Sequence, residues 1–366
     1  MIKILFFIEV LKEGGAEKVL CNLVNNMDQN QFDITVQTVW LCDASNYLAP
    51  GIHYKSMYAS PSRTNRIRYR VEAESGLAYR LHIRDDYDIE CAYLEMGPTK
   101  VMAASTNSKA KKLAWVHCDL SKKVGDIEAF VKKSVGWYSA FDKVICVSEN
   151  VRESFVELFG EKTDPQVLYN TIDDREIRNK ASFPCPERKR KMTALAIGRL
   201  TEQKGFDRLL DAHAELLREG FDYDLWILGE GPQRELLERQ IREYGMQDSV
   251  KLLGFSDNPY PFLRECDFYV CSSRYEGMST TVIESLILGK PIVTTDCTGM
   301  RELLGDSDYG LIVGDRTDAL KRGIKTMLKD ADKRAEYGRL ALERGKDFTV
   351  EVLVSQTERF LLRITG

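Results

Sequence analysis

Short apolar runs of four to eight residues alternate along the chain with longer segments in which apolar residues recur every three or four positions. The first pattern is typical of buried strands and the second of amphipathic helices. In the first half, we expect strands near IKILFFI, DITVQTVW, DIECAYLE, KLAWVHC, KVICVS and QVLYN. The alternation therefore predicts parallel sheets covered by helices on both faces.

The same alternation restarts after residues 179–191, a stretch with two prolines, a charge run and no periodicity. We expect this stretch to link an N-terminal domain over 1–178 to a C-terminal domain over 192–346. The last segment, 347–366, is expected to be a helix that returns to the first domain. The predicted fold is thus two doubly wound, Rossmann-like α/β domains that face each other across a cleft. Ligands would bind there, outside the C-terminal ends of the strands.

Composition and charge add little to this picture. The 366 residues are 43% hydrophobic with a net charge of −4, which is typical of a soluble globular protein. No apolar run approaches the roughly 20 residues that span a bilayer. Glu9 interrupts the N-terminal apolar run, so we expect a buried strand there and not a signal peptide. The nine cysteines form no C-x-x-C pair, which favours free thiols in a reducing cytoplasm.

The stretch RYEGMSTTVIES places Glu276 and Glu284 eight positions apart around a glycine and hydroxyl cluster. It follows the apolar run FYVCSS, so it predicts a turn at the C-terminal end of a buried strand. Ser279 or Thr280 would then cap a helix that runs to about Leu288.

Backbone amides at the start of that helix would form an anion site, aided by the positive end of the helix dipole. Two carboxylates beside an anion would repel it, unless they accept hydrogen bonds from hydroxyls at the two ends of the ligand. A nucleotide sugar has this arrangement of sugar hydroxyls, diphosphate and ribose hydroxyls. The alternative is a solvated helix cap with two surface acids.

The segment AIGRLTEQKGFDRLL supplies cations at the same sheet edge. Arg199 and Lys204 follow a predicted strand and could neutralise a diphosphate without a metal or another cofactor. LGEGP, at 228–232, is another strand-to-helix turn of this kind. The D-x-D triplets at 86–88 and 222–224 stand before strands, and we interpret them as solvated turns and not as metal ligands.

In order, GRLTEQKG, LGEGP, LLGF and EGMSTTVIES resemble the retaining GT-B glycosyltransferases of family four, over nearly the whole chain. The resemblance implies that Glu276 binds hydroxyls of the transferred sugar and Glu284 binds the ribose diol. The other residues that it assigns to donor binding are Arg199 and Lys204 at the diphosphate, amides of Gly277, Met278, Ser279 and Thr280 beside it, and Gly254 and Phe255 at the nucleobase.

In the first half, the resemblance points to the glycine loop LKEGGAEK and to His117. The backbone at Gly14 and Gly15 would line the reaction centre, although a plain strand-to-helix turn is an equal alternative. His117 would hydrogen-bond the sugar or orient the acceptor, against the alternative of a structural histidine. Asn170 matches the family's asparagine less well, because LYNTID departs from the usual form of that motif.

The resemblance implies a retaining hexosyltransferase that moves sugar from a UDP-sugar to a glycan or lipid-linked acceptor in bacterial surface polysaccharide or glycolipid assembly. The expected catalytic residues are His117, Glu276, Arg199 and Lys204. The diphosphate that leaves would accept the acceptor's proton, so that no protein nucleophile and no cofactor is required. A nucleotide-sugar epimerase and a non-catalytic adaptor on the same fold are the alternatives.

Basic residues concentrate in the first half of the chain. They predict peripheral docking on an anionic inner face of the plasma membrane, against the alternative of scattered solvated charges. No nucleic-acid motif accompanies them, so nucleic acid is not an expected partner. The residues are Arg63, Arg66, Arg68, Arg70, Lys100, Lys109, Lys111, Lys112, Lys122, Lys123, Lys132 and Lys133.

Overall fold

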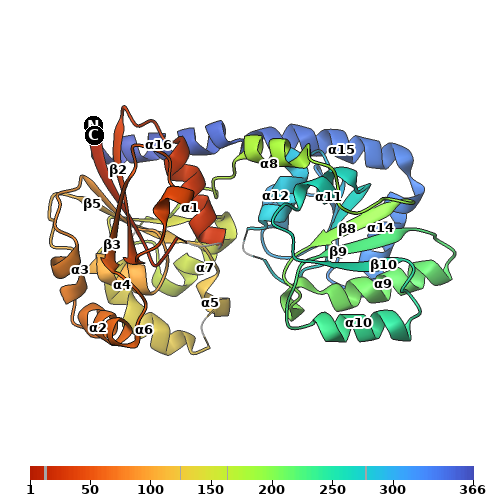
Figure 1. The fold of residues 1–366 in the computed structure, drawn as a ribbon, viewed down its shortest axis with the longest axis horizontal. Helices are drawn as coiled ribbons and strands as arrows, with labels where there is room; N and C mark the ends of the chain where they lie inside the picture. Colours follow the sequence, from red (N-terminus) through yellow and green to blue (C-terminus); the bar gives the residue numbers. More distant parts are fainter. Residues whose placement is uncertain (12–14, 124, 163, 277) are drawn as a thin grey trace. The chain divides into compact units, whose positions relative to one another are not determined.

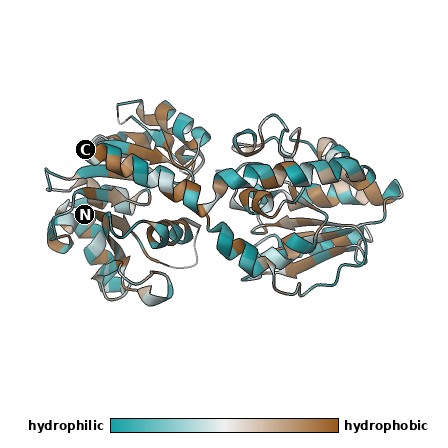
Figure 2. Cartoon of the chain, turned by 90° about the horizontal axis from the view of Figure 1, so that it is seen from above, coloured by the Kyte–Doolittle hydropathy of each residue, from teal (hydrophilic) through white to brown (hydrophobic). Residues whose placement is uncertain are grey.

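A computed structural model describes residues 1–11, 15–123, 125–162, 164–276 and 278–366 (Figure 1). The described residues divide into two compact units, Met1–Ile172 with Val350–Gly366, and Asp173–Thr349. The predicted pair of Rossmann-like α/β domains is confirmed. Figure 2 shows the hydrophobic colour concentrated on the strands inside each unit.

The strands of the first unit form one parallel sheet in the order β3-β2-β1-β4-β5-β6-β7. Their order reverses between β1 and β4, and ligands of such sheets bind at the strand ends beside this switch point. The strands are β1 (Ile2–Ile8), β2 (Phe32–Trp40), β3 (His53–Tyr58), β4 (Ile89–Ala92), β5 (Lys111–Val116), β6 (Lys143–Cys146) and β7 (Gln166–Val167).

Helices cover this sheet and bury one apolar stripe each, as in α1, where Val19, Leu20, Leu23 and Val24 are buried. The helices are α1 (Gly15–Asn26), α2 (Arg63–Glu74), α3 (Leu77–His82), α4 (Gly97–Ala103), α5 (Leu120–Lys123), α6 (Ile127–Tyr138), α7 (Glu149–Phe159) and α16 (Val350–Thr365), with the 3₁₀ turn η1 (Ala44–Asn46). None of the described helices is long and apolar enough to cross a membrane.

The C-terminal helix α16 belongs to the first unit, as the sequence predicts. It packs against α1, and Glu358 on α16 accepts a hydrogen bond from the backbone N–H of Asp28 at 2.7 Å. Val354, Phe360 and Leu361 join the buried core of this unit. The first unit is therefore built from both ends of the described chain.

The second unit has a parallel sheet in the order β10-β9-β8-β11-β12-β13, which reverses between β8 and β11. Its elements are β8 (Thr193–Ile197), η2 (Glu202–Lys204), α9 (Phe206–Arg218), β9 (Asp224–Leu228), α10 (Arg234–Glu243), β10 (Val250–Gly254), α11 (Tyr260–Glu265), β11 (Phe268–Cys271), α12 (Thr280–Ile287), β12 (Ile292–Thr295), α13 (Met300–Leu304), β13 (Leu311–Val313), α14 (Thr317–Lys329), α15 (Ala331–Gly345) and η3 (Lys346–Phe348), preceded by α8 (Asp174–Ala181).

The boundary between the units falls after Ile172, earlier than the predicted linker at 179–191. Helix α8 packs on α11 and α12, and the guanidinium of Arg264 donates to its last carbonyl, of Ala181, at 2.6 Å. The charge run behind α8 is also paired within the second unit, since Lys189 contacts Asp267 at 2.7 Å. These distant partners explain why a stretch with the composition of a linker belongs to a folded unit.

Candidate functional site

The buried centre of the site is an ion pair between two of the predicted residues. Lys204, at the end of the β8–α9 loop, donates from Nζ to Glu276 Oε1 at 2.6 Å. Ser273 donates its hydroxyl to the same oxygen at 2.5 Å, and Glu276 is only 7% exposed. Burial by itself lowers the pKa of Lys204, but the Glu276 carboxylate outweighs burial and raises that pKa. Lys204 is therefore a cation and Glu276 its neutralising partner.

Two glycines leave the space in and around the β8–α9 loop that the Lys204–Glu276 ion pair needs. A Cβ at Gly198 would come within 3.1 Å of Lys204 Cε, so the lysine side chain crosses directly over that glycine. Gly205 has φ +62° and a Cβ there would lie 2.3 Å from the carbonyl oxygen of Ser272. The Ser272 hydroxyl returns a hydrogen bond to the Lys204 carbonyl at 2.8 Å.

A buried arginine that the sequence analysis missed stabilises the β11–α12 loop through the backbone carbonyls of that loop. Arg208 on α9 donates to the carbonyl oxygens of Ser272 at 2.9 Å and Ser273 at 2.6 Å. It also forms an ion pair with Asp315. The signal in the sequence was an arginine between the buried apolar residues Phe206 and Leu209, where a charge needs specific partners.

A second arginine, Arg274, joins the two loops at their surface. Its guanidinium contacts Asp207 through two bonds, at 2.9 and 2.7 Å, and donates to the Glu202 carbonyl at 2.6 Å. Such bidentate pairs fix geometry as well as charge. The loops that carry Lys204 and Glu276 are thus held together by the residues around them.

Arg199, the other predicted diphosphate ligand, differs from Lys204 in its environment. It follows β8 and is exposed, and it forms no ion pair with any residue that the structure describes. Its carbonyl accepts a hydrogen bond from Thr201 N–H at 2.7 Å, which forms a tight turn. The site therefore contains one cation held by a carboxylate and one that is open to an anion.

Helix α12 begins and ends close to the predicted positions, with Ser279 at its N-cap and Leu288 at its C-cap. Its predicted apolar stripe is fully buried and comprises Val282, Ile283, Leu286 and Ile287. Met278 and Thr280 flank Ser279 in the described chain, whereas Gly277 lies outside the described residues.

Glu284 is half-buried on α12. The hydroxyl of Tyr260, on α11, donates to Glu284 Oε1 at 3.3 Å. Burial first, and then the Glu284 charge, raises the pKa of that phenol, so Tyr260 stays a hydrogen-bond donor. The two glutamates thus occupy different settings, one in an ion pair and one beside a phenol.

The loops after β9 and β10 lie at the same edge of the sheet. Gly229 has φ +144°, and a Cβ there would lie 2.0 Å from the Gly198 carbonyl oxygen. Its N–H donates to the carbonyl of Gly254 at 2.8 Å. Phe255, next to Gly254, is 69% exposed, so its ring is accessible for stacking. The structure brings the predicted loops after β8, β9 and β10 together.

The remaining predicted residues lie in the first unit. His117 is half-buried directly after β5, with its ring 4.9 Å from that of Tyr93. The backbone N–H groups of His117 and Cys118 both donate to Glu95 Oε1, the second at 3.1 Å. Glu95 is buried after β4, and the sequence analysis missed it. The sequence feature that could have identified Glu95 is an acidic residue shortly after a buried strand, at the C-terminal edge of the sheet.

Other residues considered from the sequence take less central positions. Gly15 is exposed at the start of α1, and Gly14 lies outside the described residues. Asn170 follows β7, and its side-chain oxygen is buried. Asp88 directly precedes β4 and Asp224 begins β9, so both triplets lie at the N-terminal ends of strands, as expected.

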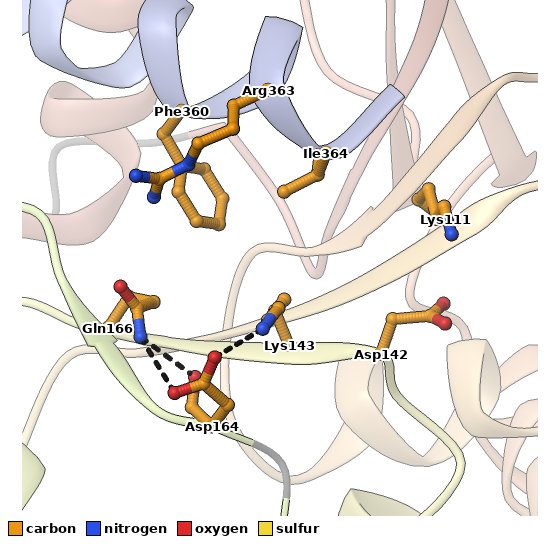
Figure 3. A pocket seen from close by; sticks show the side chains of 8 residues that line it. All are labelled: Lys111, Asp142, Lys143, Asp164, Gln166, Phe360, Arg363 and Ile364. Atoms are coloured by element: carbon orange, nitrogen blue, oxygen red, sulfur yellow. Dashed lines mark hydrogen bonds and ion pairs between the residues drawn. The ribbon is translucent and has the colours of Figure 1, made fainter. Parts of the chain in front are cut away.

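A pocket of about 490 Å³ lies at the opposite edge of the first sheet, between the starts of β5 and β6 and helix α16 (Figure 3). Lys111, Lys143 and Arg363 line it together with Asp142 and Asp164. Figure 3 shows Lys143 turned toward Asp164, with which it forms an ion pair. Its three cations and two acids leave little net charge, and none of the predicted site residues lines it.

Solved structures identify the class of fold. HepE from Anabaena, in complex with UDP, is 19% identical and superposes with a TM-score of 0.77, covering 99% of this chain and 100% of that one. The lipopolysaccharide outer core galactosyltransferase WaaB is 17% identical with a TM-score of 0.73, and 99% of each chain is covered. The fold is that of the GT-B glycosyltransferases.

Sequence comparisons identify the family. The model "Glycosyltransferase Family 4" matches residues 13–176 and "Glycosyl transferases group 1" matches 177–344. The N-acetylgalactosamine-N,N'-diacetylbacillosaminyl-diphospho-undecaprenol 4-alpha-N-acetylgalactosaminyltransferase of Campylobacter jejuni is 29% identical, covering 99% of this chain and all of the relative. The lipopolysaccharide core biosynthesis glycosyltransferase LpsE of Rhizobium meliloti is also 29% identical, over 95% and 93% of the two chains. The chain is a glycosyltransferase of the GT-B, family-four type.

Proposed function

We propose that the protein transfers a sugar from a UDP-sugar to a glycan or lipid-linked glycan acceptor, with retention of the anomeric configuration, in bacterial surface polysaccharide or glycolipid assembly. The observation that carries this proposal is the Lys204–Glu276 pair at the C-terminal sheet edge, beside the exposed Arg199. The names of the relatives support it, since HepE binds UDP and the Campylobacter relative acts on an undecaprenyl-linked sugar.

In this proposal, the site residues of the second unit together contact every part of the donor. Glu276 accepts hydrogen bonds from hydroxyls of the transferred sugar, and Glu284 accepts them from the ribose. Lys204 and Arg199 neutralise the diphosphate. Phe255 stacks on the base. The cations supply the charge that the diphosphate needs, so the scheme uses no cofactor.

The proposed reaction breaks the bond between the sugar's anomeric carbon and the diphosphate oxygen, and forms a bond from the same face to the acceptor oxygen. The departing diphosphate takes the acceptor's hydroxyl proton. The protein contributes positioning and stabilisation of the charge that develops on the diphosphate. His117, in the first unit, is assigned to acceptor orientation.

A thermal-shift screen of nucleotide sugars, followed by an assay with undecaprenyl-diphosphate-linked glycans, tests this function. We expect UDP-sugars at about 100 times their Kd to stabilise the protein by about 2.7 kcal/mol. The product should then contain an additional sugar whose anomeric configuration, read by NMR, matches that of the donor. Conversion of the donor sugar without any acceptor would favour an epimerase. A product with inverted configuration would refute retention.

Glu95 is predicted to support the reaction through the backbone at His117. In Glu95→Ala, the half-buried N–H groups of His117 and Cys118 lose this acceptor, which costs about 2 kcal/mol of unfolding free energy. We expect kcat to fall about tenfold, by about 1.4 kcal/mol, with the Kd for UDP unchanged. Glu95→Gln, which keeps an acceptor oxygen, should recover most of this loss. A folded alanine variant with wild-type kcat would contradict the role.

A further inference from the structure

Helices α2 and α3 expose apolar side chains that a monomeric domain would ordinarily bury. Ile67 is 58% and Val71 60% exposed on α2, and Leu77 is 46% and Leu81 40% exposed on α3. In each helix the two residues are four positions apart, so they lie on the same face. The helices contact each other and lie side by side at one end of the first unit (Figure 1). Single exposed apolar residues need no explanation, but two adjacent stripes indicate an interaction surface.

The same face of α2 is strongly basic. Helical spacing places Arg63 and Arg70 beside Ile67, opposite the buried Glu72, and places Arg66 at the edge of the same face. All three arginines are exposed, and none forms an ion pair with a residue that the structure describes. We call Arg63, Arg66, Ile67, Arg70, Val71, Leu77 and Leu81 the α2–α3 face.

The acid on this side of α2 is already neutralised. Glu74 forms ion pairs with Lys100 of α4 and, at 3.4 Å, with Lys133 of α6. Helix α6 therefore lies against the end of α2, and it exposes Val135 beside its own lysines. Exposed apolar residues with cations beside them thus occur on α6 as well as on α2 and α3.

A buried hydrogen-bond network fixes the orientation of α2 and α3, and therefore the side on which the α2–α3 face is exposed. Glu72, on the inner side of α2, accepts from Arg68 at 2.6 Å and contacts His82 of α3 at 2.8 Å. It also accepts from the hydroxyl of Tyr58, at the end of β3. Burial by itself raises the pKa of Glu72, but these three partners outweigh burial and lower it. A charged Glu72 therefore anchors both helices to the sheet.

We propose that the α2–α3 face docks the first unit on an anionic lipid bilayer. The arginines would bind lipid phosphates, and the apolar side chains would enter the boundary between head groups and acyl chains, which is the composition of an interfacial helix. Charge complementarity favours a bilayer, since it offers anions and apolar volume together over a broad area. The inference rests on the proposed function in one respect, since a docked enzyme would meet lipid-linked acceptors. The docking itself requires no substrate.

Several of the lysines that the sequence analysis grouped with the α2 arginines lie elsewhere or are already paired. Lys111 begins β5 at the N-terminal edge of the sheet and lines the pocket of Figure 3. Lys100 is paired with Glu74, and Lys112 donates to the carbonyl of Ser105 at 3.1 Å. The arginines of α2, and not the lysine-rich stretch, are therefore the proposed lipid ligands.

Co-sedimentation of the full chain with vesicles tests the proposal. We expect binding to phosphatidylcholine vesicles that contain phosphatidylglycerol, weaker binding at high salt, and none to pure phosphatidylcholine. Each cation near the surface contributes about fivefold to partitioning, so R63Q/R66Q/R70Q should bind about 100-fold more weakly. I67S/V71S should lose the fraction of vesicle binding that persists at high salt. The matched control, K109Q/K111Q/R363Q, removes the same charge at the opposite sheet edge and should bind as the wild type does.

Circular dichroism and UDP binding show whether each variant is folded, so that a loss of vesicle binding can be distinguished from unfolding. A folded R63Q/R66Q/R70Q variant that binds UDP but not anionic vesicles supports the docking surface. It does so whether or not the protein proves to be a transferase. Equal binding by this variant and the wild type, or failure of the wild type to bind anionic vesicles at low salt, overturns it. Equal losses in the triple variant and the control would reduce the effect to net charge and also overturn it.

Discussion

Glu276→Ala should lower turnover by about 10²- to 10³-fold while the Kd for UDP stays within about threefold of the wild type. Removal of a single preorganised electrostatic contact at a reacting centre has effects of this size. In the proposed scheme, Glu276 contacts the sugar and not the nucleotide, so UDP keeps Arg199, Glu284 and Phe255. Lys204 is then no longer paired with a carboxylate and interacts with the UDP diphosphate alone. This gain offsets any contact that UDP loses.

The same substitution should reduce stability when no ligand is bound. Lys204 would remain mostly buried without the carboxylate that it contacts at 2.6 Å, and we expect a loss of about 2 kcal/mol in the free energy of unfolding. Burial would then lower the pKa of Lys204, since the group that raises it is gone. UDP at about 100 times its Kd should stabilise the variant by about 2.7 kcal/mol, as it does the wild type.

Steady-state transfer, titration calorimetry with UDP and urea unfolding measure these three effects. Ser273→Ala is the matched control, because it removes the other hydrogen bond to Glu276 Oε1 and keeps the carboxylate. It should lower turnover by less than about tenfold, because the carboxylate and its ion pair with Lys204 remain. Wild-type turnover in Glu276→Ala would exclude any role for this residue in the reaction.

Gly229→Ala should destabilise the second unit by about 3 kcal/mol, or about 10 °C in Tm. A Cβ at this position would lie 2.0 Å from the carbonyl oxygen of Gly198, which is backbone and cannot rotate away. The β8–α9 loop must therefore move, and Lys204 moves with it. We expect UDP binding to be lost or weakened at least tenfold in the folded variant.

The control for this prediction is Gly220→Ala, because Gly220 also has a positive φ, +86°, but open space around it. It isolates the cost of the left-handed backbone, about 1 kcal/mol, from the collision. Urea unfolding and calorimetry with UDP compare the two variants. Equal losses of stability, or normal UDP affinity in Gly229→Ala, would show that the close approach to Gly198 does not matter.

The sequence predicted the fold and the elements of the site because both depend on local patterns. Alternating apolar runs imply parallel strands, and the C-terminal ends of parallel strands share one edge. The loops that contain Arg199, Gly229 and Gly254 could therefore be grouped before their contacts were known. The start and end of α12 were readable from Ser279 and the residues after Leu288.

The parts that the sequence did not predict depend on contacts between distant positions. Glu95 receives N–H groups from a strand end 22 residues away, and Arg208 binds carbonyls 64 and 65 positions further along. No local pattern marks such partners. The linker prediction at 179–191 overlooked the same kind of contact, since Lys189 pairs with Asp267 across 78 positions.

The membership of α16 in the first unit has a consequence for the order of folding during synthesis. Residues 173–349 form a continuous segment that is complete before Val350 leaves the ribosome. The first unit, although it is translated earlier, waits for its final helix to cover α1. Domains usually mature in the order in which they are made, whereas here we expect the second unit to complete its fold first. Chaperones would therefore find exposed apolar surface on the half that was translated earlier.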